Sequence, residues 1–295
     1  MEVIYQTPKF RKLKRQGLTY VDMHYHTNKS MDSSTHVSFI AKRAKMIGCG
    51  VAITDHNVIH GAINLAKKKV MVIPSIEITP SELVDIIPFF YSMSELKEFY
   101  HKYIKDYIKP NIGFNFNRVT WKFEEILEKL EKYNCLITVP HYAAPYPQNA
   151  EDFFKKNQGL LKRIHGFEVL NGLMRKDRNK KAQDIAKELN RCFVGGSDGH
   201  TLLQLGRVIT ITENSDIEGF LDHIKNKQNI VMGEELNWSY RKLVQLIIIK
   251  NALKLRVKEE VKKPVELVER TVERAERTVE KIKEKSKTQF KKLRK

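Results

Sequence analysis

Segments typical of buried strands alternate with segments typical of amphipathic helices along most of this chain, and that order limits the fold more than any other feature. One unit, for example, runs from GVAIT over residues 50–54, through a helical stretch, to VMVIPSIEI over residues 70–78. The pattern repeats about seven times. Strict alternation of this kind predicts an α/β fold with a parallel sheet, which is either closed into a barrel or covered by helices on both faces.

Side chains of the kind that bind metals stand where the expected strands end. In an extended strand, residues i and i+2 face the same side, so Asp22, His24 and His26 project together. The carboxyl ends of parallel strands meet on one face of an α/β fold, so we expect one pocket to collect the side chains found there. These are His24 and His26 on the first strand, then Asp55 with His56, Glu77, His141, and Asp198 with His200 on later strands. Imidazole nitrogens and carboxylate oxygens are ligands that divalent transition metals accept.

Six short motifs resemble those of the PHP superfamily, the polymerase and histidinol phosphatase domain. They are DMHYHTNKSMDSS, ITDHN, IPSIEIT, TVPHY, FEVLNG and GGSDGH, and they lie between residues 19 and 212. The resemblance implies a distorted seven-stranded (β/α) barrel of PHP type, with two or three divalent ions of zinc, manganese or iron at its carboxyl-terminal face. It also implies the hydrolysis of phosphate esters.

The resemblance further implies roles for individual residues. Asp198, His200 and Glu77 would be catalytic through a metal-bound hydroxide, and Asp55 would orient a histidine rather than bind metal. Asp85 departs from the pattern, because it stands where members of the family often carry a histidine. The implied ligands of the first metal are His24, His26, Glu77 and Asp198. Glu77 would bridge to the second metal, which His141 would also bind, together with Asp85 if it takes the place of the missing histidine. The implied ligands of the third metal are Asp32, His56 and His200.

The charge of the chain favours an anionic partner. Lys and Arg number 53 against 35 Asp and Glu, which gives a net charge of +18. A solvated, Lys-rich surface is the alternative explanation of this excess. Three basic residues follow the expected strand that carries Glu168: Arg175, Lys176 and Arg178. They form either a phosphate clamp or the solvated start of a helix.

These observations lead to one main hypothesis and leave two alternatives open. The main hypothesis is a metal-dependent phosphoric ester hydrolase that cleaves a phosphate monoester of a small molecule or a nucleotide by a metal-bound hydroxide. The first alternative is a PHP-type nuclease that acts on the ends of DNA or RNA, with nucleic acid as its partner. The second is a non-catalytic, metal-stabilised barrel that is used for binding.

Composition divides the chain into three parts. We expect a basic N-terminal leader over residues 1–17, the barrel domain over residues 18–257 and a charged helical tail over residues 258–295. In the tail, apolar residues recur at spacings of four and three from Val268 to Ile282, which is the pattern of a short heptad seam. Self-association through this helix, docking of the helix on the barrel and a frayed charged terminus stay open as its roles.

The remaining features concern the compartment. The longest apolar run, Leu243 to Ile249, is too short to span a membrane, and the N-terminus lacks the apolar core of a signal peptide. Cys49, Cys135 and Cys192 lie in or beside apolar runs, so they are expected to be buried thiols rather than a disulfide framework. We therefore expect a cytoplasmic protein.

Overall fold

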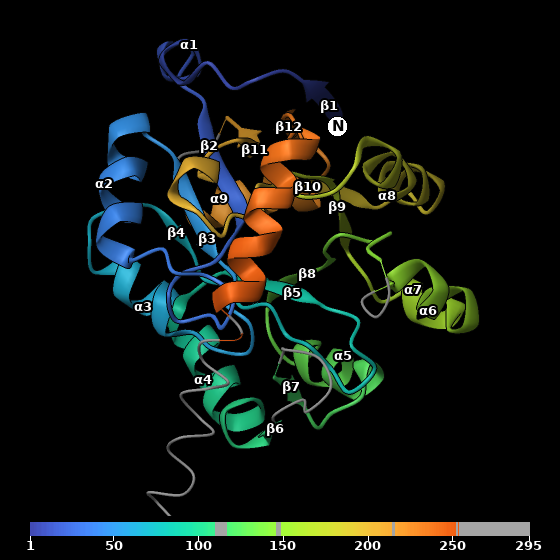
Figure 1. Ribbon diagram of the computed structural model, residues 1–295. Coiled ribbons are helices and arrows are strands. Elements are labelled where there is room, and N and C mark those ends of the chain that lie inside the picture. Colours follow the sequence, from blue (N-terminus) through green and yellow to red (C-terminus); the bar gives the residue numbers. More distant parts are fainter. Residues whose placement is uncertain (110–116, 146–148, 214–215, 252, 254–295) are drawn as a thin grey trace, which may run out of the picture. The chain divides into compact units, whose positions relative to one another are not determined.

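The computed structural model describes residues 1–109, 117–145, 149–213, 216–251 and 253. The chain divides into two compact units, residues 1–251 and 252–295. The expected boundary at 257/258 and the heptad segment of the tail lie outside the described residues. The first unit carries the fold and the candidate site (Figure 1).

Two sheets form the centre of the first unit. The larger sheet has six strands in the order β1-β12-β11-β2-β3-β4, and the smaller has four in the order β10-β9-β8-β5. Strands β6 (Ile108–Lys109) and β7 (Arg118–Val119) make a separate pair. The strands of the two main sheets are β1 Glu2–Tyr5, β2 Thr19–Tyr25, β3 Gly50–Ile53, β4 Val72–Ile73, β11 Val208–Thr212 and β12 Ile230–Gly233, and then β5 Ile87–Phe90, β8 Cys135–Val139, β9 Gly166–Asn171 and β10 Cys192–Gly196.

The expectation of a purely parallel sheet is wrong in two places. The runs β2-β3-β4 and β8-β9-β10 are parallel, but β11 is antiparallel to β2 and β12, and β5 is antiparallel to β8. The segment before β5 turns back on itself as a hairpin, since Ile78 and Ile86 exchange backbone hydrogen bonds of 2.9 and 3.0 Å. A hairpin needs no crossover helix, so β5 runs against the direction of its neighbours.

The first residues of the chain belong to the larger sheet. Strand β1 pairs in parallel with β12, with Glu2 opposite Ile230 and Tyr5 opposite Gly233. Residues 2–5 of the expected basic leader over residues 1–17 therefore form part of this sheet. Because β12 itself falls beyond the last expected strand, neither partner of this pair was visible in the alternating pattern.

Helices flank the sheets, and their boundaries follow local sequence signals. The Ser92 hydroxyl caps α4 by accepting the N–H of Glu95, and Gly48, with φ of +68°, ends α2 in the left-handed conformation. In α5, the buried residues recur at helical spacing from Phe123 to Leu130. The helices are α1 Phe10–Arg15, α2 Val37–Ile47, α3 His60–Ala66, α4 Met93–Tyr103, α5 Phe123–Leu130, α6 Ala150–Lys156, α7 Gln158–Leu161, α8 Lys176–Glu188 and α9 Ile217–Lys225, with 3₁₀ turns η1 Lys105–Tyr107 and η2 Leu202–Gln204.

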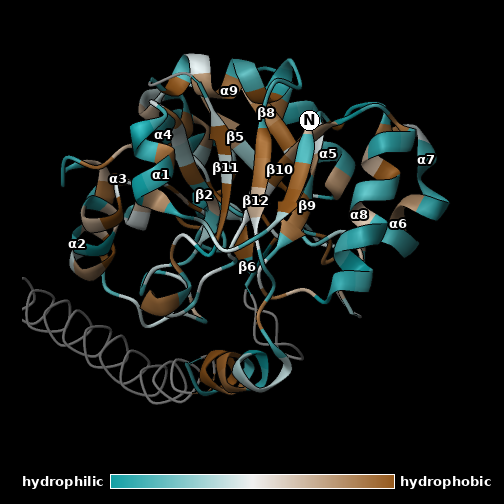
Figure 2. Cartoon of the chain, turned by 90° about the horizontal axis from the view of Figure 1, so that it is seen from above, coloured by the Kyte–Doolittle hydropathy of each residue, from teal (hydrophilic) through white to brown (hydrophobic). Residues whose placement is uncertain are grey.

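The core lies between the helices and the strands. Figure 2 shows apolar residues concentrated on strands such as β8, β9 and β10, while α8 is mostly hydrophilic. The three cysteines are buried and unpaired, as expected. Single bridges join the two sheets: Tyr25, at the end of β2, pairs with Gly199 after β10, and Ser75, after β4, pairs with Phe89 of β5. These bridges are compatible with a closed barrel, which stays a prediction.

A further helix covers the carboxyl ends of the strands. It begins at Trp238 and runs through residue 251 of the described chain, where Figure 1 draws it in orange. Its Val244 is fully buried, and Asn251 donates a hydrogen bond of 3.2 Å to the carbonyl oxygen of Asp32. Among the described residues, no helix is long and apolar enough to cross a membrane.

Candidate metal centre

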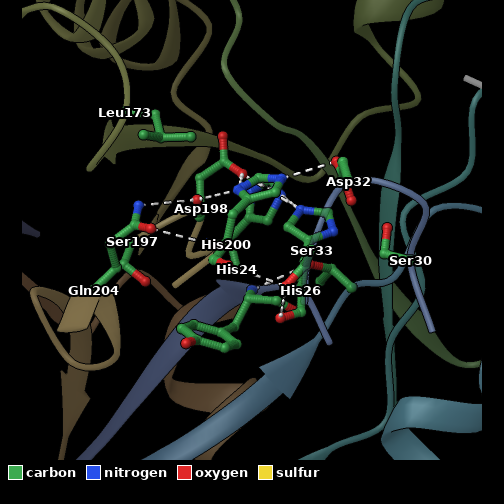
Figure 3. Close-up of polar contacts among 12 residues, drawn as sticks. His24, His26, Ser30, Asp32, Ser33, Leu173, Ser197, Asp198, His200 and Gln204 are labelled. Atoms are coloured by element: carbon green, nitrogen blue, oxygen red, sulfur yellow. Dashed lines mark hydrogen bonds and ion pairs between the residues drawn. The ribbon is translucent and has the colours of Figure 1, made fainter. Parts of the chain in front are cut away.

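The nine residues expected to bind metal lie together at one end of the strands. All of them are at least nine-tenths buried, with exposed fractions from 0 to 8%. Figure 3 shows His24, His26, Asp198 and His200 turned toward one another, with Asp32 facing them from the loop after β2. Four overlapping groups of these side chains bring ligand atoms within 4.8 Å of one another. His60, a nearby histidine, is instead exposed at the start of α3.

The first group consists of His24, His26, Glu77 and Asp198. The Nε2 atoms of the two histidines are 3.1 Å apart, and each lies 3.3–3.5 Å from Glu77 Oε2 and Asp198 Oδ1. Ligand atoms around a tetrahedral ion with bonds of about 2.0–2.2 Å are separated by roughly 3.3–3.6 Å. The four side chains are therefore spaced as the corners of a metal site.

Glu77 connects this group to a second one. Its other oxygen, Oε1, lies 3.0 Å from Nε2 of His141, and Asp85 Oδ2 lies 3.8 Å from the same nitrogen. The hydroxyl of Thr79 donates to Asp85 Oδ1 at 2.6 Å, which leaves Oδ2 on the side of the cluster. The hairpin between β4 and β5 explains this position, because the pairing of Ile78 with Ile86 returns Asp85 opposite Thr79, two residues after Glu77.

A third group surrounds Asp32. Its Oδ2 lies 2.8 Å from Nε2 of His200 and 3.3 Å from Nε2 of His56. The Asp32 Oδ1 atom is buried and has no hydrogen-bond partner among the described residues. A buried carboxylate oxygen without a donor is costly unless a cation or water meets it, so this group fits a bound metal ion.

Glu168, in the middle of β9, has no expected role in the sequence analysis, and the structure supplies one. Its Oε1 lies 3.1 Å from Nδ1 of His24, and its Oε2 accepts the backbone N–H of His141 and the amide of Asn171. Holding Nδ1 of His24 in this way leaves Nε2 to face the metal position. The available signal was an acid in the middle of an apolar strand, which must find a buried partner.

Two other acids support the site from outside it. Asp22 does not join the histidines, because its oxygens accept hydrogen bonds from the backbone and hydroxyl of Ser197 and thereby tie β2 to the residue before Asp198. Both oxygens of Asp55 accept hydrogen bonds from Thr27, at 2.6 and 2.7 Å, and its expected role in orienting a histidine stays a prediction. Asp55 fixes the residue that follows His26.

Backbone geometry brings the first group together. Asp198 and His141 have φ values of +49° and +30°, in a region that costs energy for residues other than glycine. Gly196 makes the close approach possible, because a Cβ at this position would lie 2.4 Å from the backbone nitrogen of His24. Strain and close backbone contact are therefore concentrated at the ends of β8 and β10, where the ligands project.

Charges within the cluster compensate one another. Burial raises the pKa of a carboxyl group, but the surrounding imidazoles reverse this effect and hold the pKa values of Glu77 and Asp198 below their usual range. Burial likewise opposes protonation of the histidines, yet the carboxylates raise the pKa of His56 to about 10 and of His141 to about 9. Burial and a neighbouring imidazole lower the pKa of His26 to about 4. A metal ion can take the place of the protons that balance the carboxylates.

Comparison with known proteins now identifies the family. The profile of the PHP domain matches residues 22–284, which is most of the chain. The chain belongs to the PHP domain family. No curated protein matches the sequence significantly.

Several solved structures share the fold. A two-domain protein from Bacteroides vulgatus with a predicted PHP-like metal-dependent phosphoesterase has a TM-score of 0.52 and 16% identity, over 80% of this chain and 70% of that chain. PsfC from Pseudomonas syringae has a TM-score of 0.54 and 16% identity, over 79% and 98%. Endonuclease Q bound to a 27-mer duplex with an abasic lesion has a TM-score of 0.57 and 20% identity, over 74% of this chain and 60% of that chain. At these identities the similarity concerns the fold.

Proposed function

We propose that this PHP-family chain is a metal-dependent phosphoesterase that hydrolyses a phosphate monoester or a nucleotide. The observation that carries the proposal is the spacing of four side chains. The Nε2 atoms of His24 and His26 lie 3.1 Å apart, and each lies 3.3–3.5 Å from oxygens of Glu77 and Asp198. We also infer that the two sheets are parts of one distorted (β/α) barrel whose carboxyl-terminal face holds this site.

The donor set fits two or three divalent ions of zinc, manganese or iron. In this proposal, His24, His26, Glu77 and Asp198 hold the first ion, and Glu77 shares the second with His141 and Asp85. Asp32, His56 and His200 hold the third. When bound, such ions neutralise charge on phosphoryl oxygens and lower the pKa of water so that it can attack phosphorus at neutral pH.

The protein holds the ligands in position. Glu168 fixes the tautomer of His24, and Asn171 donates to Asp198 Oδ2 at 3.1 Å, so both ligands are held before a metal or substrate arrives. The hydroxyl groups of Ser33 and Thr35 are engaged by the backbone, because both donate to the carbonyl oxygen of His200. This arrangement supports direct attack by water rather than a covalent step on a side chain.

Turnover measurements test the proposal. Purified full-length protein, loaded in turn with zinc, manganese and iron, is offered a panel of phosphomonoesters, nucleotides and oligonucleotides. We expect phosphate release that a chelator abolishes and that Asp198→Asn and His24→Ala reduce at least as strongly as the about 10–100-fold typical of outer-shell changes. Undiminished activity in these variants would contradict the proposal, and the absence of any metal-dependent turnover would favour a non-catalytic binding role.

A nuclease is the second candidate. The net charge of +18 and the similarity of fold to endonuclease Q support it, although the chain spans only 60% of that protein. A nuclease of this kind would bind labelled strands with an affinity that falls steeply as salt increases. If strands are neither bound nor shortened, this candidate fails while the monoesterase remains.

A further inference from the structure

A basic pocket lies beside the metal centre. It has a volume of about 240 Å³ and opens between the loop after β9, the start of α8 and the helix that begins at Trp238. Pockets for whole small molecules usually measure about 300–1,000 Å³, so this one is suited to a single chemical group. We call it the arginine pocket, because Arg175, Arg178 and Arg241 line it together with Lys242.

The cations of the arginine pocket are held mainly by uncharged partners. Arg178 donates to the carbonyl oxygen of Ala143 at 2.9 Å, and Arg241 donates to that of Leu236 at 2.6 Å. Lys242 places its ammonium group 4.0 Å from the centre of the Trp238 ring. Among the described residues, the ion pair formed by these cations is that of Arg175 with Asp177 at 2.9 Å. Positive charge therefore remains in excess.

Arg241 shows the effect of this crowding. Its Nε atom is buried and has no hydrogen-bond partner in the described part of the chain. Burial lowers the pKa of Arg241, and the charges of Arg175 and Arg178 lower it further, against the opposing effect of nearby acids. An anion between the guanidinium groups would relieve the repulsion and meet the free N–H.

The pocket shares its supports with the metal centre. Asn171 accepts the backbone N–H groups of Leu173 and Met174 on one side and donates to Asp198 on the other. Figure 3 shows Leu173, which lines the pocket, on the Asp198 side of the cluster. Arg178 is likewise bonded to Ala143, two residues after His141. The arginine pocket and the metal centre are therefore held next to each other by the same residues.

We propose that the arginine pocket binds a second phosphate group of the substrate while the first phosphate lies at the metal centre. This inference rests on the proposed phosphoesterase function and narrows its substrate to a compound with at least two phosphates. Planar guanidinium groups bind phosphate through paired N–H bonds, which suits them to this task. Lys176 takes no part, since it lies over the ring of Tyr5 and outside the pocket.

Kinetics with matched substrates test the inference. The probes are p-nitrophenyl phosphate, a nucleotide with phosphates on two ribose hydroxyls and a 5′-phosphorylated trinucleotide. In Arg178→Gln and Arg241→Gln we expect KM for the nucleotide and the trinucleotide, which carry more than one phosphate, to rise by about 10–100-fold relative to KM for p-nitrophenyl phosphate, as the loss of a charged hydrogen bond predicts. The control is Arg163→Gln, which removes an arginine that pairs with Glu131 on the surface.

The pattern of responses identifies the source of the phosphate. If the arginine variants raise KM for the two-phosphate nucleotide, the substrate is a small nucleotide. If they raise KM for the trinucleotide alone, the substrate is the end of a nucleic-acid strand. If both arginine variants change the ratio no more than Arg163→Gln does, the pocket does not bind substrate. Arg175→Gln, on an exposed side chain, serves as a third variant if either of the others fails to fold.

A binding measurement keeps the two proposals separate. The chain has two tryptophans, so Trp121→Phe leaves Trp238 as the reporter of the pocket. Added inorganic phosphate should change its fluorescence, and Arg241→Gln should weaken that response. If no probe is hydrolysed, the phosphoesterase proposal fails while this titration still tests the pocket. An unchanged fluorescence together with unchanged KM ratios would overturn the inference.

Discussion

Glu168→Gln tests whether the shell around the ligands determines metal binding. The two oxygens of Glu168 have different partners, Nδ1 of His24 on one side and the N–H groups of His141 and Asn171 on the other. An amide has only one oxygen. If that oxygen stays with His141 and Asn171, the amide nitrogen faces His24 and favours the tautomer whose Nε2 carries a proton and cannot bind metal.

The opposite orientation of the amide is no better. It would direct the NH₂ group at the two N–H donors, which would leave buried donors without acceptors. Loss of an outer-shell partner of this kind typically costs about 10–100-fold in metal affinity, which corresponds to about 1.4–2.8 kcal/mol. We therefore expect Glu168→Gln to weaken binding of the first metal by about this factor.

Competition with a chromophoric chelator measures the affinity, and a thermal melt verifies that the variant is folded. Glu131→Gln is the matched control, because it removes a carboxylate that is 44% exposed and pairs with Arg163. A folded Glu168→Gln protein that binds metal as tightly as the control would refute the argument that Glu168 sets the tautomer of His24.

Three more outcomes follow from the structure. Gly196→Ala should lower the free energy of unfolding by about 1–3 kcal/mol and should also weaken metal binding, because the new Cβ would collide with His24. The control is Gly159→Ala, whose new Cβ has open space and should leave the melting temperature unchanged. Metal binding should release protons, because their raised pKa values keep His56 and His141 protonated at pH 7. The affinity for metal should therefore rise as the pH approaches 9. Calorimetry in buffers of different ionisation enthalpy would detect the released protons. Removal of metal by a chelator should lower the melting temperature in a way that added manganese or zinc reverses; an unchanged melt would contradict a site that binds only the folded chain.

The sequence predicted those features that depend on local pattern and on the ends of strands. The alternation of segments indicated the α/β class, and the structure gathers all nine expected ligands, most of which stand where parallel strands end. Asp85 was the uncertain member, since it precedes its strand. The hairpin that includes Ile78 and Ile86 turns that strand around and places Asp85 with the others, which alternation alone could not show.

The missed features depend on contacts between distant segments. The pairing of β1 with β12 joins segments that are far apart in the sequence, and the sequence of neither strand indicates with which strand it pairs. Glu168 and Asp22 looked like ordinary strand acids until their partners, His24 and Ser197, were known. Arg241 comes from a helix far along the chain, so the arginine pocket could not be assembled from the basic residues at the start of α8.

The metal content of the purified full-length chain tests the central claim most directly. Elemental analysis after dialysis should find two or three equivalents of zinc, manganese or iron per chain, and it should find fewer in His24→Ala and Asp198→Asn. A folded protein that contains no divalent transition metal, and takes up none when each ion is supplied, would contradict the proposal that these buried histidines and carboxylates form a metal centre.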